Sequence, residues 1–502
     1  MGSFFAELDA VFSNVGDRVC LHLADGEIWT YARLHTQVVH TASALVGNGV
    51  GCDDRVVVQV DKSPENLALY LATLYVGAIY VPLNTAYTQA EVDYFIADAA
   101  PALFVGEQPR TDVASLTLDA GGGGSLTMAI QEAMDEAKDP ANNSEQAPSF
   151  APREADDLAA ILYTSGTTGR SKGAMLTHGN LASNAHALSQ AWGWRDDDVL
   201  LHALPIFHVH GLFIATHCAL LQGTPMVFMP KFDAAAVLQH LPRCTVLMGV
   251  PTFYTRLLGE SGLTKDRVAH IRVFICGSAP LTEQTFAEWE SRTGHRILER
   301  YGMSETIINT TNPLDGDRVP GTVGFALPGL AIRIADEHGV ELPRGEVGTI
   351  EVSGPAVFKG YWQMPDKTRA EIRSDGFFIT GDLAVQDDEG RVSIVGRAKD
   401  LVITGGYNVY PKEVEQLIDA LPGIVESAVI GISHADFGEG VVAVIVPDGA
   451  DVELATVNAA LADQLARFKQ PKALVNVREL PRNAMGKVQK NLLRETYSKI
   501  FE

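Results

Sequence analysis

The nine residues from Thr164 to Lys172 are dense in groups that could bind phosphate. Five of them carry hydroxyls, two are glycines, and two are the cations Arg170 and Lys172. Glycines let backbone amides approach an anion closely, and a lysine adds a point charge. The P-loop of NTPases has a glycine directly before its lysine. Because Ser171 stands there in this chain, the run predicts a phosphate-binding loop of a different kind.

Two carboxylates stand in contexts that suit nucleotide chemistry. Glu305 follows Ser304 in "YGMSET", and a glutamate is a hard-oxygen ligand suited to Mg²⁺. Asp382 ends the apolar run "FFITGD", where its oxygens could accept hydrogen bonds from ribose hydroxyls. Taken alone, Glu305 also fits an exposed surface carboxylate, and Asp382 also fits a turn residue. Residue type and spacing leave both interpretations open.

The histidines of "FHVH", His208 and His210, are expected to share one face of a strand. A zinc site needs a third protein ligand at a suitable spacing, and the sequence offers none, so zinc is not expected. The chain has no G-x-S-x-G pattern, which argues against a serine hydrolase.

Six segments of the chain resemble the signature motifs of the adenylate-forming superfamily, which includes acyl-CoA synthetases, peptide-synthetase adenylation domains and firefly-type luciferases. In chain order they are "YTSGTTGRSKGAMLTH", "ICGSAPL", "ERYGMSET", "FFITGDLA", "VGRAKDLVITGGYNVYPKEVE" and "PRNAMGKVQK". Their order between about residues 160 and 490 makes a chance match negligible. The resemblance implies an AMP-forming acid–thiol ligase that uses ATP, Mg²⁺ and coenzyme A.

The resemblance also implies roles for individual residues. Lys487 would be the catalytic lysine that bridges the substrate carboxylate and the α-phosphate, with Glu305 and His208 as further catalytic residues. Glu305 and Ser304 would hold Mg²⁺, and Asp400 would be the hinge about which the small domain turns. The residues expected to bind ATP and CoA are Thr164, Ser165, Gly166, Thr167, Thr168, Gly169, Lys172, Ser278, Ala279, Pro280, Tyr301, Gly302, Ser304, Asp382, Arg397, Gly405 and Gly406.

Within this set the resemblance distinguishes several tasks. Tyr301 would stack on adenine, and Asp382, supported by Arg397, would bind the ribose. Gly405 and Gly406 would line the path of the phosphopantetheine arm of CoA.

The stretch "TVLMGVPTFYTRLLG" bears on the identity of the acid. Thr252 is predicted to cap a helix in which Arg256 follows one turn later among apolar residues. By itself Arg256 fits a surface side chain. The chain also resembles the malonate-activating branch of the superfamily, which implies that Arg256, with Ser278 and His208, binds malonate. Arg256 and Ser278 would hold its distal carboxylate.

The expected reaction is malonate + ATP + CoA → malonyl-CoA + AMP + diphosphate through malonyl adenylate, with methylmalonate as a possible secondary substrate. Three alternatives stay open. They are another small or medium carboxylic acid, transfer of the acyl group to a carrier protein, and a nucleotide-binding sensor without catalysis. The resemblance also suggests a protein acetyltransferase acting on Lys487 as a partner, because acetylation would remove its charge.

The apolar patterns predict an α/β fold. "RVVVQVDKS" and "AIYVPLN" are typical of buried strands, with a helix begun by Pro64 between them, which indicates a parallel crossover unit. A large N-terminal domain is predicted over residues 1–396, made of several subdomains, with a hinge at 397–400. A small, mobile C-terminal α+β domain is predicted over 401–502, in an acetyl-CoA synthetase-like fold. Residues 118–157, rich in Gly, Pro and acidic residues, are predicted to form a surface excursion, and a helix is expected over 454–468.

Composition narrows the function classes further. The net charge of −23 argues against nucleic acid as a partner, and five scattered cysteines without a C-x-x-C pair fit a reducing compartment. The N-terminus lacks the pattern of a signal peptide. Residues 199–230 contain no Asp, Glu, Lys or Arg, but prolines, glycines and histidines interrupt them, so buried globular elements are favoured over a membrane span. We expect a cytoplasmic protein with no membrane association.

Overall fold

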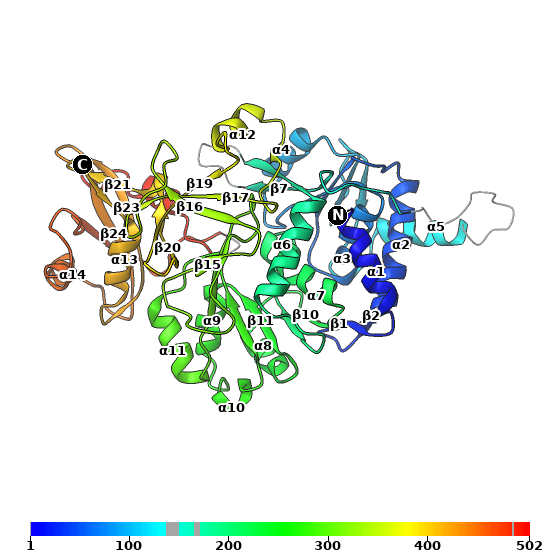
Figure 1. Cartoon of the computed structure of the whole chain (residues 1–502), viewed down its shortest axis with the longest axis horizontal. Helices are drawn as coiled ribbons and strands as arrows, with labels where there is room; N and C mark the ends of the chain where they lie inside the picture. Colours follow the sequence, from blue (N-terminus) through cyan, green and yellow to red (C-terminus); the bar gives the residue numbers. More distant parts are fainter. Residues whose placement is uncertain (1, 137–149, 165–170, 484–485) are drawn as a thin grey trace.

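The structure, a computed structural model, describes residues 2–136, 150–164, 171–483 and 486–502. Five of the predicted nucleotide-binding residues, Ser165, Gly166, Thr167, Thr168 and Gly169, lie outside the described residues. Figure 1 shows a large body that contains the N-terminus and a smaller body, built from the last hundred or so residues, that contains the C-terminus.

The first sheet of the large body contains the predicted crossover unit. Strand β3 (Arg55–Gln59) leads through α3 (Pro64–Tyr75) to β4 (Ile79–Pro82), and the two strands are parallel. Pro64 occupies the first turn of α3, and the hydroxyl of Ser63 accepts a hydrogen bond from the amide of Asn66, so local sequence begins the helix. The sheet runs in the order β18-β8-β7-β4-β3-β5-β6. Its other strands are β5 (Leu103–Gly106), β6 (Ser115–Thr117), β7 (Leu158–Thr164), β8 (Lys172–Thr177) and β18 (Gly360–Tyr361).

The second sheet has a parallel centre and antiparallel edges, in the order β15-β14-β13-β12-β11-β9-β10-β1-β2. Its central strands are short apolar runs that are buried on both faces, as expected when helices cover a parallel sheet. The strands are β1 (Val19–Leu23), β2 (Ile28–Thr30), β9 (Leu200–His202), β10 (Met226–Phe228), β11 (Val246–Gly249), β12 (Val273–Cys276), β13 (Leu298–Tyr301), β14 (Thr310–Thr311) and β15 (Phe325–Ala326).

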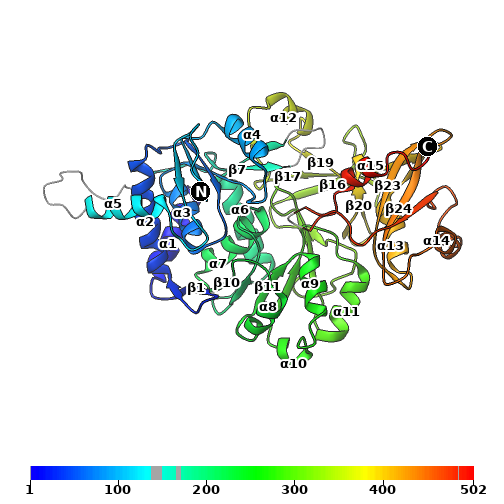
Figure 2. The same ribbon diagram turned by 180° about the vertical axis from the view of Figure 1, so that it is seen from behind.

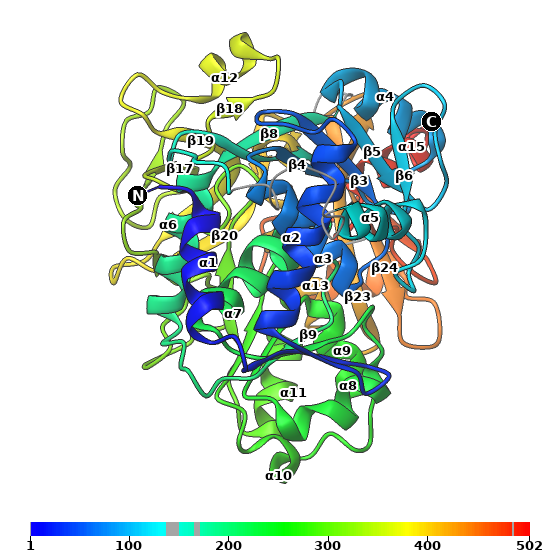
Figure 3. The same ribbon diagram turned by 90° about the vertical axis from the view of Figure 1, so that its right-hand side faces the viewer.

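Helices cover these two sheets and form a continuous apolar core with them. Tyr31, Tyr70 and Trp192 belong to this core and are almost completely buried. Figure 3 shows α1, α2 and α3 side by side, and these helices contact one another. The helices of the large body not yet named are α1 (Phe4–Asn14), α2 (Tyr31–Gly47), α4 (Gln89–Ala99), α5 (Ser125–Glu136), α6 (His178–Ala191), α7 (His217–Gln222), α8 (Ala234–His240), α9 (Pro251–Leu258), α10 (Lys265–Val268), α11 (Glu283–Thr293) and α12 (Pro365–Glu371).

A third, antiparallel sheet lies toward the small domain, as the view from behind in Figure 2 shows. Its order is β16-β17-β19-β20, with strands β16 (Ala331–Ala335), β17 (Gly348–Ser353), β19 (Phe378–Gln386) and β20 (Val392–Arg397). After β20 the chain makes a short 3₁₀ turn, Ala398–Asp400, before it enters the small domain.

The small domain is an α+β unit around one sheet, in the order β22-β21-β24-β23 with β25 beside β24. Alternating apolar residues of β23 and β24 pack against helices on one face and the C-terminal segment on the other. Its elements are β21 (Val402–Thr404), β22 (Tyr407–Val409), α13 (Pro411–Asp419), β23 (Ile424–His434), β24 (Gly438–Pro447), α14 (Leu454–Leu461), β25 (Ala473–Asn476) and α15 (Lys490–Thr496).

The structure departs from the sequence predictions at a few elements. The excursion at 118–157 includes helix α5, and the helix predicted over 454–468 ends at Leu461, after which the chain turns and buries Leu465. His208 and His210 do not share a strand, because the chain turns at His208 and His210 begins a π-helical segment. Helix α9 begins at Pro251 after Val250, so Thr252 is not its cap.

The apolar stretch 199–230 forms β9, the π-helical segment, α7 and β10 within the core, as predicted. Among the described residues, no helix combines the length and apolar character needed to cross a membrane. The compartment stays a prediction.

Candidate active site

The phosphate-loop prediction falls on the connection between β7 and β8. These strands are antiparallel, and Thr164 pairs with Lys172 across them, so the two described ends of the loop lie together. The hydroxyl of Thr164 is 3.5 Å from Oε1 of Glu305, which follows β13. The hairpin therefore brings Thr164, at the described start of the predicted phosphate loop, to the predicted metal ligand.

Glu305 is a buried carboxylate at the centre of this region. The Tyr361 hydroxyl lies 3.1 Å from its Oε1, and Ser304 directly before it is half-buried. Burial raises the pKa of Glu305, while hydrogen bonds from its own amide and from Tyr361 and the charge of Lys172 lower it, and the net shift is upward. A carboxylate whose ionised form is destabilised by burial gains from a nearby cation.

These residues fit the magnesium ion that the sequence predicts. Among the described residues no group of three or more His, Cys, Asp or Glu side chains could hold a metal ion. Mg²⁺ in nucleotide sites is commonly held by one or two carboxylates and by substrate phosphates. Glu305, next to the phosphate-loop ends, offers that single carboxylate.

The predicted ribose ligand lies in a compact polar group on the third sheet. Asp382 of β19 faces Arg397 of β20 across the sheet, and Nε of Arg397 is 2.8 Å from Oδ1 of Asp382. The Tyr301 hydroxyl donates a hydrogen bond of 2.6 Å to Oδ2. The charge of Asp382 raises the pKa of Arg397 against the opposing effect of burial, so the pair is a stable ion pair. Sequence predicted all three residues, and the structure brings them together.

Lys487 lies where the small domain meets this group. Its side chain is exposed, and the charged groups of Arg397, Asp382, Lys399 and Asp400 act on it. Desolvation lowers the pKa of Lys487 to about 8, with the like charge of Arg397 next, while Asp382 raises it. The preceding residue, Gly486, approaches α9 so closely that a Cβ there would lie 3.4 Å from Oγ1 of Thr252. The predicted catalytic lysine is thus beside the predicted ribose ligand, more than 300 residues from the phosphate loop.

Ser278, His210 and His208 form a second polar group. Ser278 has a left-handed backbone (φ 72°), and its hydroxyl is hydrogen-bonded to Nδ1 of His210 at 3.1 Å. The amide of His210 donates to Nδ1 of His208. Burial and the charge of Arg300 lower the pKa of His208 to about 4, so both imidazoles are neutral at physiological pH. Ala279 and Pro280 follow Ser278 in the turn after β12.

Arg300 belongs to this group and was missed by sequence reasoning. It is 4% exposed, and in the described part of the chain its Nε and Nη2 atoms have no hydrogen-bond partner. The guanidinium packs on Gly277, where a Cβ would lie 2.5 Å from its Cζ. Burial lowers the pKa of Arg300 to about 10. Side chains alternate along β13, so Arg300 lies on the face opposite Tyr301. The motif "ERYG" could have predicted this, because Arg300 directly precedes Tyr301.

Arg256 has different surroundings. It lies in the last turn of α9, and its side chain is exposed. The contacts described here do not join it to Ser278 or His208. Its assignment as the ligand of a second carboxylate stays a prediction.

Gly405 and Gly406 form the turn between β21 and β22, and both have left-handed backbones, with φ of 59° and 81°. The amide of Gly405 donates to the carbonyl of Phe437. The Phe437 ring is 41% exposed, and Nζ of Lys472 lies 4.6 Å from its centroid. An exposed aromatic ring and a lysine thus flank the glycine turn, a combination that sequence reasoning did not identify.

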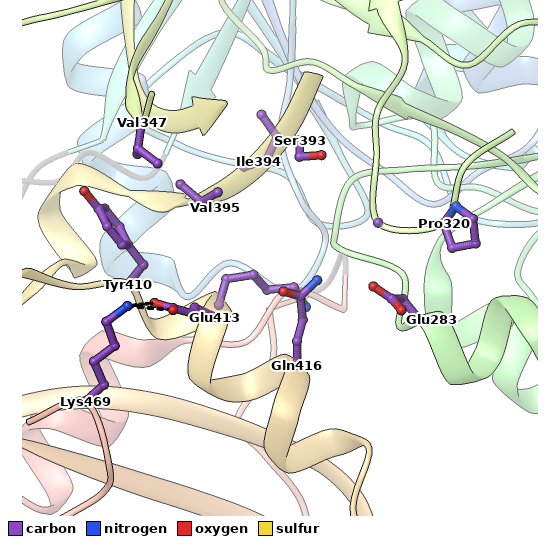
Figure 4. Close-up of a pocket in the computed structure, with 12 residues that line it drawn as sticks. Glu283, Pro320, Val347, Ser393, Ile394, Val395, Tyr410, Glu413, Gln416 and Lys469 are labelled. Carbon is purple, nitrogen blue, oxygen red and sulfur yellow. Dashed lines mark hydrogen bonds and ion pairs between the residues drawn. The ribbon is translucent and has the colours of Figure 1, made fainter. Parts of the chain in front are cut away.

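Asp400, the predicted hinge residue, forms an ion pair with Arg494 of α15. A cavity of about 440 Å³ lies at the domain boundary nearby, and Figure 4 shows its lining. Glu283 and Pro320 of the large domain face Glu413 and Gln416 of α13 across it, while Lys469 bonds Glu413 at 2.6 Å. The residues that line this cavity come from both domains, and the predicted site residues are not among them.

The chain matches the family model of the AMP-binding enzyme over residues 8–362 and that of the AMP-binding enzyme C-terminal domain over residues 413–487. A malonate–CoA ligase of Arabidopsis thaliana is 32% identical over 547 residues, which cover 99% of this chain and 89% of the relative. The crystal structure of ATP-bound MatB from Rhodopseudomonas palustris is 53% identical, covers 100% of both chains and gives a TM-score of 0.94.

The structure of apo MatB is 54% identical with the same coverage, but its TM-score is 0.83. The arrangement of this chain is therefore more similar to that of the ATP-bound structure. The family models cover most of the sequence, and the fold and domain plan agree with those of the matched structures. The chain belongs to the AMP-binding enzyme family.

Proposed function

We propose that the protein is an ATP-dependent malonate–CoA ligase, which converts malonate, ATP and CoA to malonyl-CoA, AMP and diphosphate. The names of its relatives support this activity. The observation that carries the choice of acid is the buried guanidinium of Arg300, whose Nε and Nη2 atoms have no hydrogen-bond partner among the described residues, near the Ser278–His210 pair.

A buried cation without a counter-charge is costly, and a substrate carboxylate beside it offsets that cost. The planar guanidinium can bind a carboxylate through two parallel hydrogen bonds. A dicarboxylate can place one carboxylate at Arg300 and Ser278 while the other reacts. A fatty acid would instead bring its apolar tail into contact with the charged guanidinium of Arg300. We therefore assign Arg300 to the distal carboxylate and keep Arg256, on the exposed face of α9, as a second candidate.

In the first half-reaction the reacting carboxylate attacks the α-phosphate, and diphosphate leaves. Two anions must approach each other, so a cation at the developing charge lowers the barrier. We assign this task to Lys487, and the electrostatic influence of Asp382 and Arg397 on its side chain supports the assignment. Tyr301 and Asp382 would bind the nucleoside, and Lys172 would bind the departing phosphates. Glu305 and Ser304 would hold Mg²⁺, which would neutralise part of the charge of those phosphates when bound.

In the second half-reaction the CoA thiol attacks the acyl carbonyl and AMP leaves. The turn Gly405–Gly406 would line the path of the phosphopantetheine arm once the small domain has turned about Asp400. Phe437 offers a face for stacking the adenine of CoA, and Lys472 beside it offers a charge for a phosphate. His208, neutral and near the acyl end, would contact the substrate without carrying charge.

The substrate assignment is tested by measuring diphosphate release with ATP, Mg²⁺ and CoA over malonate, methylmalonate, acetate, octanoate and an aromatic acid. We expect malonate to be preferred. Replacing CoA by a carrier protein tests the acceptor. Activity with octanoate but not with malonate would contradict the proposal.

Two arginine variants locate the distal carboxylate. Arg300→Met should lose malonate turnover by about a hundredfold or more, the loss typical of a buried charged hydrogen-bond partner, while ATP binding persists. Arg256→Met removes an exposed arginine of the same size and serves as the matched comparison. Loss in Arg256→Met alone would transfer the role to that residue.

Acetylation of Lys487 by a protein acetyltransferase is proposed only as a consequence of this mechanism. It would neutralise the charge that the first half-reaction needs. Acetylated protein should fail to form the adenylate yet convert supplied malonyl adenylate, which mass spectrometry and thioester assays can follow.

A further inference from the structure

Lys172, at the end of the phosphate loop, is held by a group from a distant helix. Its Nζ lies 3.5 Å from Oε1 of Glu371, the last residue of α12, and 4.1 Å from the centroid of the Tyr361 ring. The Lys172 side chain is 11% exposed and that of Glu371 21%. A mostly buried carboxylate thus lies beside the loop lysine.

Glu371 has other partners besides Lys172. Lys367, one turn earlier on α12, is 2.7 Å from the same oxygen Oε1. The Tyr361 hydroxyl donates to Oε2 at 2.6 Å. The contacts of Glu371 with Lys367 and Tyr361 are short, whereas its contact with Lys172 is long. Glu371 therefore keeps a cation and a hydrogen-bond donor when Lys172 moves away. Departure of Lys172 therefore leaves no buried carboxylate without a partner.

Tyr361 connects this arrangement to the predicted metal ligand. A phenol has one hydrogen to donate, and its shorter contact is with Glu371 rather than with Glu305, at 3.1 Å. Glu371 thus contacts both Lys172 and Tyr361, which border the expected phosphate-binding region. The same carboxylate competes with phosphate for Lys172.

We propose that Glu371 is a positioning residue that holds Lys172 when phosphate is absent and recaptures it as diphosphate leaves. The inference rests on the adenylation step of the proposed function and is independent of which acid is used. It assigns to α12 a part in product release. Lys172 would exchange one anionic partner for another, so neither its charge nor that of Glu371 is left isolated at either stage.

The test is isothermal titration of the full-length protein with inorganic diphosphate and Mg²⁺, which requires neither acid nor CoA. Glu371→Gln keeps the size of the side chain and removes the competing charge. We expect it to bind diphosphate about three- to tenfold more tightly, the range for loss of a partly buried competing pair. Lys367→Met should act in the opposite direction, because Glu371 would then hold Lys172 more strongly.

The decisive comparison is the same Glu371→Gln change in a Lys172→Met background. If Glu371 acts through Lys172, the tightening should vanish there. If the tightening persists in the double variant, Glu371 acts through a general change of the electrostatic field. If Glu371→Gln alone leaves the diphosphate affinity unchanged, Glu371 does not compete with diphosphate. Either result overturns the proposal. Asp366→Asn, which removes a charge from an exposed site of the same helix, is the matched control and should change affinity less than twofold.

A structural role for Glu371 alone predicts a different pattern. It would lower the melting temperature and weaken diphosphate binding, whereas recapture predicts tighter binding and stronger product inhibition. If Glu371→Gln does not fold, Lys367→Met at its more exposed position carries the test. Failure of the malonate screen would leave these binding results unaffected, so the two proposals fail separately.

Discussion

At the scale of single residues, two cations in unfavourable surroundings mark the proposed chemistry. Arg300 is a buried cation with open hydrogen-bonding positions, and Lys487 is a cation whose surroundings lower its pKa. Asp382, in contrast, is fully engaged by Arg397 and Tyr301. The first two are expected to gain most from an anionic substrate, since its negative charge offsets the cost of their desolvation.

Lys487→Ala should separate the two half-reactions. We expect adenylate formation, measured by diphosphate exchange, to fall about a hundredfold or more, the loss typical of one preorganised electrostatic contact. Conversion of supplied malonyl adenylate and CoA to thioester should be nearly unchanged. Lys490→Ala, on the same segment and paired with Glu415, is the comparison variant. Equal loss of both half-reactions would contradict the role given to Lys487.

The pKa of Lys487 also predicts a pH dependence. The lysine must be protonated to stabilise the developing charge, and its pKa in the free protein is lowered to about 8. The kcat/KM of adenylation for ATP should therefore decline as pH rises through about 8, because this parameter reports groups of the free enzyme. Lys487→Arg should shift the decline to higher pH. A decline at the same pH in Lys487→Arg would assign it to another group.

Sequence predicted the nucleotide end of the site better than the acyl end. Asp382, Arg397 and Tyr301 sit in long motifs whose order fixes their roles by resemblance. The acyl end depends on which side chains point inward from short elements. Arg256 follows Thr255 and Arg300 follows Glu299, so the local sequence does not show which of them points inward. Burial separates them, because Arg256 is exposed and Arg300 is not.

At the scale of elements, the alternation of β13 places different chemistry on its two faces. Arg300 lies on one face, while Glu299 and Tyr301 share the other. Glu299 is 7% exposed, and its Oε1 has no hydrogen-bond partner in the described part of the chain. Burial raises the pKa of Glu299 from 4.5 to about 8, against the lowering effects of the Gly321 amide and of Lys412 from the small domain.

This shift predicts how stability depends on pH. A carboxyl with a raised pKa binds its proton more tightly in the folded state, so its stabilising contribution is full below pH about 4.5 and is lost as pH rises toward 8. Glu299→Gln should remove this loss and raise the free energy of unfolding at pH 8 by about 1–3 kcal/mol. Urea unfolding between pH 5.5 and 8.5 measures it. Parallel stability curves for variant and wild type would contradict the assignment.

Strongly periodic elements were predictable, and elements set by tertiary packing were not. The β3–α3–β4 unit follows from apolar runs and from Ser63 and Pro64 at the helix start. The π-helical segment at His210 was missed, because its close packing comes from contact with Pro205, whose carbonyl leaves no room for a Cβ at Gly211. Local propensity carries no information about such a contact.

At the scale of the whole molecule, the domain arrangement fits the proposed first half-reaction. Lys487 lies beside Asp382, while the Gly405–Gly406 turn carries exposed neighbours, among them Tyr407 at 60% and Ile403 at 52%. Exposed apolar residues next to a proposed binding turn fit a surface that becomes covered at another stage. We therefore infer that the small domain must turn about residues 397–400 before CoA reacts.

A reversible cross-link tests this rotation. A Cβ at Gly486 would lie 3.4 Å from Oγ1 and 3.5 Å from Cγ2 of Thr252, so cysteines at these positions are close enough to form a disulfide across the domain boundary. The positive φ of Gly486, 74°, adds some strain to the cysteine. The exposed Cys52 should be replaced by serine in the same protein to prevent mispairing.

The oxidised Thr252→Cys/Gly486→Cys protein should form malonyl adenylate but fail to convert it to malonyl-CoA, and reduction should restore the second step. Gly486→Cys alone controls for damage to the neighbouring Lys487. If the cross-linked protein made thioester as fast as the same protein after reduction of the disulfide, one arrangement would suffice for both half-reactions. The cross-link would then exclude domain rotation, because Gly486 and Thr252 cannot separate while the disulfide is intact.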